Sequence, residues 1–218
     1  MQLPLFPLQT VLFPRAPVRL HVFEDRYKEM MLHCIDEASP FGVVLIKSGT
    51  EAGGPLPDPH LIGCTAVITK AAALANGDLN IEAVGTERFR ILSLVPGQPY
   101  LVAHVETLAV QRPDEEAMAL SGTRLRRWLE RYLAVLSTAS GEDIDPTSGR
   151  LPADPLALAY VAASVLPLPS TEKQALLAER RADSLVDDVC ALYRRELPIL
   201  ETMVAGRDDV LPGPFSRN

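Results

Sequence analysis

The sequence predicts an α+β fold in which a small β-barrel with one inserted helix is followed by a helical bundle. Two observations lead to this prediction. Apolar residues recur mostly at every second position from residue 1 to about 110, as in half-buried strands. After Pro113 they recur about every 3.6 residues, as in helices that face a core. We therefore expect a barrel domain at 1–110, a helical bundle at 111–205 and a flexible tail at 206–218.

The first 28 residues alternate short apolar runs with prolines, at positions 4, 7, 14 and 17. Because proline has no N–H to donate, this spacing favours short edge strands and turns. Glu24 and Asp25 then suit the positive end of a helix that we expect over 24–38. Its apolar side chains fall on one stripe: Tyr27, Met30, Met31, Cys34, Ile35 and Ala38. Ser39-Pro40 ends the helix.

The remaining strands of the barrel are expected at short apolar runs bounded by turn residues. Residues 41–46 and 64–69 are two such runs, separated by a loop rich in glycine and proline. Asn76-Gly77 predicts a tight hairpin turn, since this dipeptide readily takes positive φ angles. Pro96-Gly97 predicts a second hairpin. Six or so short strands in this length indicate a closed or half-closed barrel.

Four or so helices are expected after Pro113. The first carries a stripe of Leu125, Trp128, Leu129, Tyr132 and Leu136, and a linker is expected at 140–152. Asp154-Pro155 combines a helix cap with a proline in the first turn and predicts a buried helix over 156–166. Thr171 and Gln174 have capping-box spacing for the next helix, and the last is expected over 183–200.

Composition and charge exclude several classes of protein. With 47% hydrophobic and 22% charged residues among 218, the chain is typical of globular proteins. The net charge of -7 argues against nucleic acid as a partner. No run reaches the roughly 18 apolar residues of a membrane span. Cys34, Cys64 and Cys190 are widely spaced without C-x-x-C pairs, so we expect reduced core thiols and a cytoplasmic protein.

The motifs that mark common catalytic sites do not occur in this sequence. It contains no Walker A loop, no G-x-S-x-G elbow, no H-E-x-x-H and no G-x-G-x-x-G. Its four histidines, at 21, 33, 60 and 104, stand apart from any ligand spacing. We therefore predict that the protein is not an enzyme and has no catalytic residues, cofactor or metal. A hydrolase assembled from scattered Cys, His and Asp residues remains the alternative.

One polar cluster is predicted, from Glu24, Arg26, Arg88 and Arg90. A carboxylate between Phe23 and Tyr27 would be costly if it were desolvated and unpaired. We expect Glu24 to accept hydrogen bonds from one of the three arginines and to join the first helix to a strand of the barrel. The role expected for this cluster is structural rather than ligand binding.

An ordered succession of motifs resembles the Lon substrate-binding domain family. It comprises L-P-L-F-P-L, V-L-F-P, L-x-V-F-E-D-R-Y-K-E-M-M, F-G-V-V-L, G-C-T-A-V-I, L-x-I-E-A-V-G-T-E-R-F-R-I and P-Y-L-V-A-H-V. The resemblance covers about residues 1–200. It implies a PUA-like barrel and a small helical bundle that engage unfolded polypeptides. Because the sequence shows neither the AAA+ motor nor the Ser-Lys protease of Lon enzymes, we expect a stand-alone member.

Besides the alternative of a hydrolase, two binding functions remain open at this stage. The first is a non-catalytic substrate-recognition or adaptor protein that binds unfolded or extended polypeptides, with a protease or chaperone as a further partner. The second is RNA binding, because PUA-like barrels occur in RNA-modifying proteins and arginines cluster at 124, 126, 127 and 131. The binding residues and the oligomeric state are not predicted.

Overall fold

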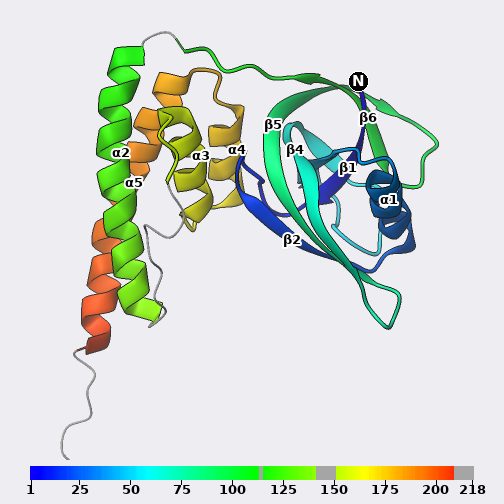
Figure 1. The fold of residues 1–218 in the computed structure, drawn as a ribbon, viewed down its shortest axis with the longest axis horizontal. Helices are drawn as coiled ribbons and strands as arrows, with labels where there is room; N and C mark the ends of the chain where they lie inside the picture. Colours follow the sequence, from blue (N-terminus) through cyan, green and yellow to red (C-terminus); the bar gives the residue numbers. More distant parts are fainter. Residues whose placement is uncertain (113–114, 141–150, 209–218) are drawn as a thin grey trace, which may run out of the picture. The chain divides into compact units, whose positions relative to one another are not determined.

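The computed structural model describes residues 1–112, 115–140 and 151–208, and its fold is of the predicted α+β class (Figure 1). The chain forms two compact units. One comprises Met1–Gln111 with Ala163–Arg181, and the other Arg112–Ala162 with Ala182–Asn218. Residues 163–181, expected within the helical domain 111–205, thus belong to the unit that contains the sheet. The tail expected at 206–218 lies outside the described residues from 209 onward.

The first unit is built on a mixed six-stranded sheet. Its described strands are β1 (Gln2–Leu8), β2 (Pro17–Val22), β3 (Phe41–Ser48), β4 (Asp58–Ala73), β5 (Leu79–Val95) and β6 (Leu101–Thr107), in the order β2-β5-β4-β3-β1-β6. Because β5 also pairs with β6, the sheet curls into a PUA-like barrel, while β2 remains an edge strand. The interior is filled by Leu3, Leu5, Val44, Phe89, Ile91, Leu101, Ala103 and Val105.

Both predicted hairpin turns are confirmed, since Gly77 and Gly97 have φ angles of 84° and 81°. The strands around them are longer than expected, with 16 residues in β4 and 17 in β5. Bulges in both strands allow this length, because they bend a strand so that it can pair with different neighbours along its course. The β4–β5 hairpin therefore extends beyond the point where β3 stops pairing with β4, while β2 stays paired with β5 as far as Leu79 (Figure 1).

The inserted helix α1 (Asp25–Asp36) matches the predicted stripe with two exceptions, Ile35 and Ala38, which are exposed; Ala38 also lies beyond the end of the helix. Met30, Met31 and Cys34 are fully buried, whereas Ile35 is 37% exposed. Ile35 sits at the margin of the stripe, and helical periodicity does not distinguish a margin position from a central one. The expectation that Ile35 is buried was wrong.

Helix α1 ends in a Schellman motif. The Ser39 N–H donates to Cys34 O at 3.0 Å and the Ala38 N–H to Ile35 O at 3.2 Å. This motif needs a left-handed residue, usually glycine, and here Ala38 takes that conformation with a φ of 47°. Its Cβ is therefore strained against the carbonyl that follows.

Replacing Ala38 with glycine should raise the free energy of unfolding by about 0.5 to 1 kcal/mol, because the relief of this strain exceeds the entropy that glycine loses on folding. Urea denaturation measures the change. The same substitution at Ala134, an exposed position of the helix spanning 115–140, should instead destabilise by about 1 kcal/mol. A loss of stability in both variants would contradict the assignment of strain to Ala38.

The second unit is helical and contains α2 (Glu115–Ser140), most of α3 (Pro155–Val165) and α5 (Ala182–Asp208). Helices α2 and α5 lie side by side (Figure 1), and the rings of Tyr132 and Tyr193 meet edge to face at 5.3 Å. The predicted cap of α3 is confirmed, since Asp154 Oδ2 accepts from the Ala157 N–H at 3.0 Å. Trp128, expected to be buried, is only half-buried.

With α4 (Ser170–Ala178), which belongs to the first unit, the described residues after Pro113 contain the expected four helices. The linker expected at 140–152 lies mostly outside the described residues. Within the described ranges, no helix combines the length and apolar content needed to cross a membrane.

Candidate functional site

A groove in the first unit lies between the end of α1 and the middle of β4, and we call it the α1–β4 groove. Its volume is about 310 Å³. The helix contributes Cys34, Ile35, Ala38 and Ser39, and the strand contributes residues 67–71. The lining is mainly apolar, with Lys70 as its one charged side chain. Such a lining suits an uncharged, apolar ligand segment.

One side of β4 is unpaired along this groove. β3 pairs with β4 only as far as Phe41 opposite Ala66. β5 pairs with β4 further, as far as Ala73 opposite Leu79. In the register of the described strands, β4 therefore has a neighbour on the β5 side alone from Val67 to Ala73. A strand edge of this kind presents free N–H and C=O groups to which an extended chain can add.

Apolar side chains are exposed around this edge. Ile35 and Val67, which line the groove, are 37% and 47% exposed. Beyond them, residues 71–75 read Ala-Ala-Ala-Leu-Ala and all are exposed. Four or more consecutive exposed apolar residues are unusual in a soluble fold and mark an interaction surface when they serve a function. The groove and the hairpin beyond it thus offer an apolar partner both exposed apolar side chains and an open strand edge.

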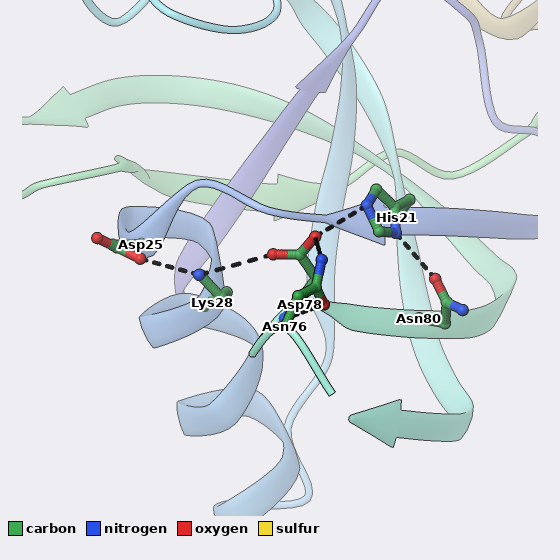
Figure 2. Close-up of polar contacts among 6 residues, drawn as sticks. All are labelled: His21, Asp25, Lys28, Asn76, Asp78 and Asn80. Carbon is green, nitrogen blue, oxygen red and sulfur yellow. Dashed lines mark hydrogen bonds and ion pairs between the residues drawn. The ribbon is translucent and has the colours of Figure 1, made fainter. Parts of the chain in front are cut away.

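Six polar residues gather at the β4–β5 turn, as Figure 2 shows, and we call them the hairpin network: His21, Asp25, Lys28, Asn76, Asp78 and Asn80. Asp78 is their centre. Its carboxylate lies 3.1 Å from His21 Nε2 on β2 and 3.9 Å from Lys28 Nζ on α1. Asp78 Oδ2 also accepts from Asn76 Nδ2 at 2.7 Å. The network joins the β4–β5 turn to both β2 and α1.

The hairpin network positions the β4–β5 turn and is not suited to catalysis. Its six side chains include a His–Asp pair, but none carries a hydroxyl or thiol that could act as a nucleophile. His21 Nδ1 lies 3.0 Å from Asn80 Oδ1. His21 was expected to be an isolated histidine because Asp78 is 57 positions away in the sequence. The pairing of Val22 with Leu79 brings them together, and no local signal predicts that register.

Comparison with known proteins identifies the family. A family model for the ATP-dependent protease La (LON) substrate-binding domain matches residues 2–194. The chain belongs to this family. It is 25% identical over 204 residues to the Lon protease of Anaeromyxobacter dehalogenans and 26% identical over 204 residues to Lon protease 2 of Myxococcus xanthus. In each case the match covers 91% of this chain and 24% of the relative, so the chain spans about a quarter of their length.

Solved structures of Lon N-terminal domains have the same fold. The Lon N-terminal domain protein from Xanthomonas campestris is 27% identical, with a TM-score of 0.62 over 88% of this chain and 98% of that chain. The N-terminal domain of Mycobacterium avium complex Lon protease is 17% identical, with a TM-score of 0.68 over 89% and 98%. At that identity the second match concerns the fold alone. The resemblance noted in the sequence is confirmed.

The four residues of the predicted polar cluster do not come together in this Lon-family domain. Arg26 donates to Glu24 Oε2 at 2.8 Å, as expected for one pair. Arg88, in contrast, is 2% exposed and donates to Leu177 O at 2.7 Å. Arg90 donates to Glu106 Oε1 from Nε at 2.8 Å and is half exposed. The expected link from Glu24 to β5 was wrong because both β5 arginines have closer partners that are distant in sequence.

The described part of this Lon-family chain provides little for catalysis. No group of three or more His, Cys, Asp or Glu residues among the described residues could hold a metal ion. Burial raises the pKa of the Cys64 thiol to about 12, and burial also raises the pKa of the Cys34 and Cys190 thiols. Since the thiolate is the reactive form, these cysteines are poor nucleophiles at neutral pH.

The thiols of the native protein should therefore react slowly with Ellman's reagent at pH 8. In the unfolded protein, all three thiols should react. In guanidinium the thiols regain an ordinary pKa and become accessible. The absorbance change of native and unfolded samples measures this directly. A native thiol that reacts within seconds would contradict the assignment of all three cysteines to the core.

Proposed function

We propose that this chain is a non-catalytic substrate-recognition or adaptor protein that binds extended, apolar polypeptide segments in the α1–β4 groove. One observation carries the proposal: the edge of β4 from Val67 to Ala73 is unpaired where it borders an apolar groove. In this proposal a bound segment adds to β4 as a further strand. Its main chain pairs with the edge and its alternate side chains enter the groove.

The chemistry of the edge suits a transient ligand. A bulge lies at Thr69, where the register with β5 shifts between Ile68 and Lys70. Bulges and lysines are devices that keep edge strands from pairing permanently with other copies. A peptide would therefore gain main-chain hydrogen bonds at a site that discourages stable self-association. Release of the bound segment is what a substrate-recognition protein needs.

Family membership supports the same role, since the matching family is described as a substrate-binding domain. In this proposal the bound polypeptides are unfolded or extended, and a protease or a chaperone receives them. The chain acts in the cytoplasm, where its three buried thiols stay reduced.

RNA binding has less support. Three of the four clustered arginines are engaged within the second unit. Arg124 lies 3.6 Å from Asp187, Arg131 lies 2.7 Å from Glu201, and Arg126 donates to Pro152 O. Two of these contacts place a carboxylate beside the cation and so reduce the positive charge available to phosphates. We therefore keep polypeptide binding as the single proposed function.

Val67→Glu and Ile35→Asp should each weaken peptide binding by roughly tenfold or more, because each buries a carboxylate against an apolar ligand. Fluorescence anisotropy with a labelled nonapeptide rich in leucine and valine measures the affinity. Leu92→Glu is the matched control, since Leu92 is 58% exposed on β5 and does not line the groove. Melting curves establish that each variant is folded.

The peptide itself tests the mode of binding. Methylating alternate backbone nitrogens removes the N–H groups that a strand needs, so the methylated peptide should bind much more weakly than its parent. Equal affinity of both peptides would contradict strand addition. Unchanged affinity in both groove variants would contradict the site.

A further inference from the structure

Lys70 is the middle residue of the open edge of β4, which runs from Val67 to Ala73. It also lines the α1–β4 groove, where no other described lining residue is charged. The remaining walls suit uncharged side chains, so Lys70 sets a different requirement at this one position. A ligand strand that covers the ammonium group removes it from water, which is costly unless the ligand also pairs the charge.

The ammonium group of Lys70 has no polar partner among the described residues, although the side chain is exposed. The other three lysines of the chain each contact an oxygen atom: Lys28 lies 2.9 Å from Asp25 (Figure 2), Lys47 lies 3.5 Å from Asp58, and Lys173 donates to Ser164 O at 3.2 Å. Lys70 therefore differs from them in having its charge available to a ligand.

The cross-strand neighbour of Lys70 is Glu82 on β5, directly opposite in the register. Opposite charges in this position can pair, yet no ion pair joins these two described residues. A bulge lies beside them at Thr69, whose hydroxyl donates to Glu82 O at 3.0 Å. Bulges re-aim the side chains around them. Lys70 is thus left for a partner on the open side of β4.

We infer that Lys70 selects extended polypeptide segments that carry a glutamate or aspartate at the position facing it, with apolar residues before and after. The inference rests on the proposed function, which supplies the added strand. Residues that face each other across paired strands have Cβ atoms about 5 Å apart, so a carboxylate there reaches the ammonium group.

The acidic residue is internal to the segment rather than its C-terminus. The open edge continues on both sides of Lys70, over residues 67–69 and 71–73. An acidic side chain lets the added strand continue in both directions, whereas a C-terminal carboxylate facing Lys70 leaves one half of the edge unpaired. The internal position therefore gains more main-chain hydrogen bonds.

The same charge disfavours a second copy of this chain as the occupant. Because Lys70 is central in the edge, symmetric antiparallel pairing of two such edges places two lysines opposite each other. Like charges directly opposite are destabilising. An acidic segment gains at the position where a second copy loses.

The test measures the affinities of three labelled nonapeptides by fluorescence anisotropy. All three have leucine and valine flanks and blocked ends, and their central residue is glutamate, glutamine or lysine. The native protein should bind the glutamate peptide roughly twofold to fivefold more tightly than the glutamine peptide, and the lysine peptide more weakly than either.

Variants assign this preference to one residue. Lys70→Glu should reverse the order of the three peptides, and Lys70→Gln should remove the preference for glutamate. Lys47→Glu is the matched control, because it changes the net charge by the same amount but does not line the groove. It should keep the native order.

The outcomes separate this inference from the proposed function. Equal binding of all three peptides by the native protein, or a preference for glutamate that persists in Lys70→Gln, would overturn the inference and leave the proposed function standing. Binding of no peptide would overturn the proposed function, and the inference with it. If an unblocked C-terminus on the glutamine peptide gained as much affinity as the central glutamate, the internal position would be wrong.

Discussion

Replacing Arg88 with methionine is expected to lower the free energy of unfolding of the first unit by roughly 3 kcal/mol or more. Arg88 is 2% exposed and donates to the carbonyls of Leu177 and Glu179 at the end of α4. Methionine fills much of the volume but leaves both carbonyls without this donor. It also removes a positive charge from the negative end of the helix dipole. Urea denaturation, followed by circular dichroism, measures the loss.

Arg90→Met is the matched control, two residues further along the same strand. The Arg90 side chain is 49% exposed and pairs with Glu106, which is 43% exposed. Exposed pairs of this kind contribute little, so the control should lose less than about 1 kcal/mol. A similar loss in both variants would contradict the role of Arg88 in holding α4.

Replacing Met30 with alanine should destabilise the first unit by about 2 to 5 kcal/mol, the range observed when a large core side chain is truncated. Met30 is fully buried on the face of α1 that packs against the barrel. The substitution leaves a cavity that the barrel closes only in part. Thermal and urea unfolding of the purified variant measure the effect.

Leu32→Ala provides the comparison on the same helix, because Leu32 is 50% exposed. Its loss should remain within about 0.5 kcal/mol. If Leu32→Ala were as damaging as Met30→Ala, the buried face of α1 would have been assigned incorrectly.

The predictions that succeeded depend on short stretches of sequence. The α1 stripe with Met30 and Met31 follows from helical periodicity, and Gly77 and Gly97 follow from the positive φ that tight turns require. Asp154-Pro155 follows from capping chemistry within one helical turn. In each case the deciding interaction lies within a few residues, so the sequence alone contains it.

Gln174 shows why other predictions failed. Its spacing from Thr171 predicted a capping box, yet α4 starts at Ser170 after Pro169 without a side-chain cap. The Gln174 side chain instead donates to Ile62, 112 positions away in the sequence. Arg88 was misassigned for the same reason, since its acceptor Leu177 is 89 positions away. Capping rules compare neighbours and cannot weigh a partner that arrives through the tertiary fold.

The α1–β4 groove was not predicted either, although residues 64–69 were correctly expected to form a strand. What makes the site is that β3 stops pairing at Ala66 while β5 continues to Ala73. This difference is a matter of register between strands. Alternation of apolar residues fixes which face of a strand is buried, but not where its neighbour ends.

Hydrogen exchange of the backbone amides tests the central claim most directly. When the leucine-valine nonapeptide is added, slowed exchange should appear within residues 67–73 of β4, because strand addition protects the amides that face the ligand. Residues 79–84 of β5, already paired with β2 on one side and β4 on the other, should not change. Protection confined to residues outside 67–73, with none along this edge, would contradict polypeptide binding at the α1–β4 groove.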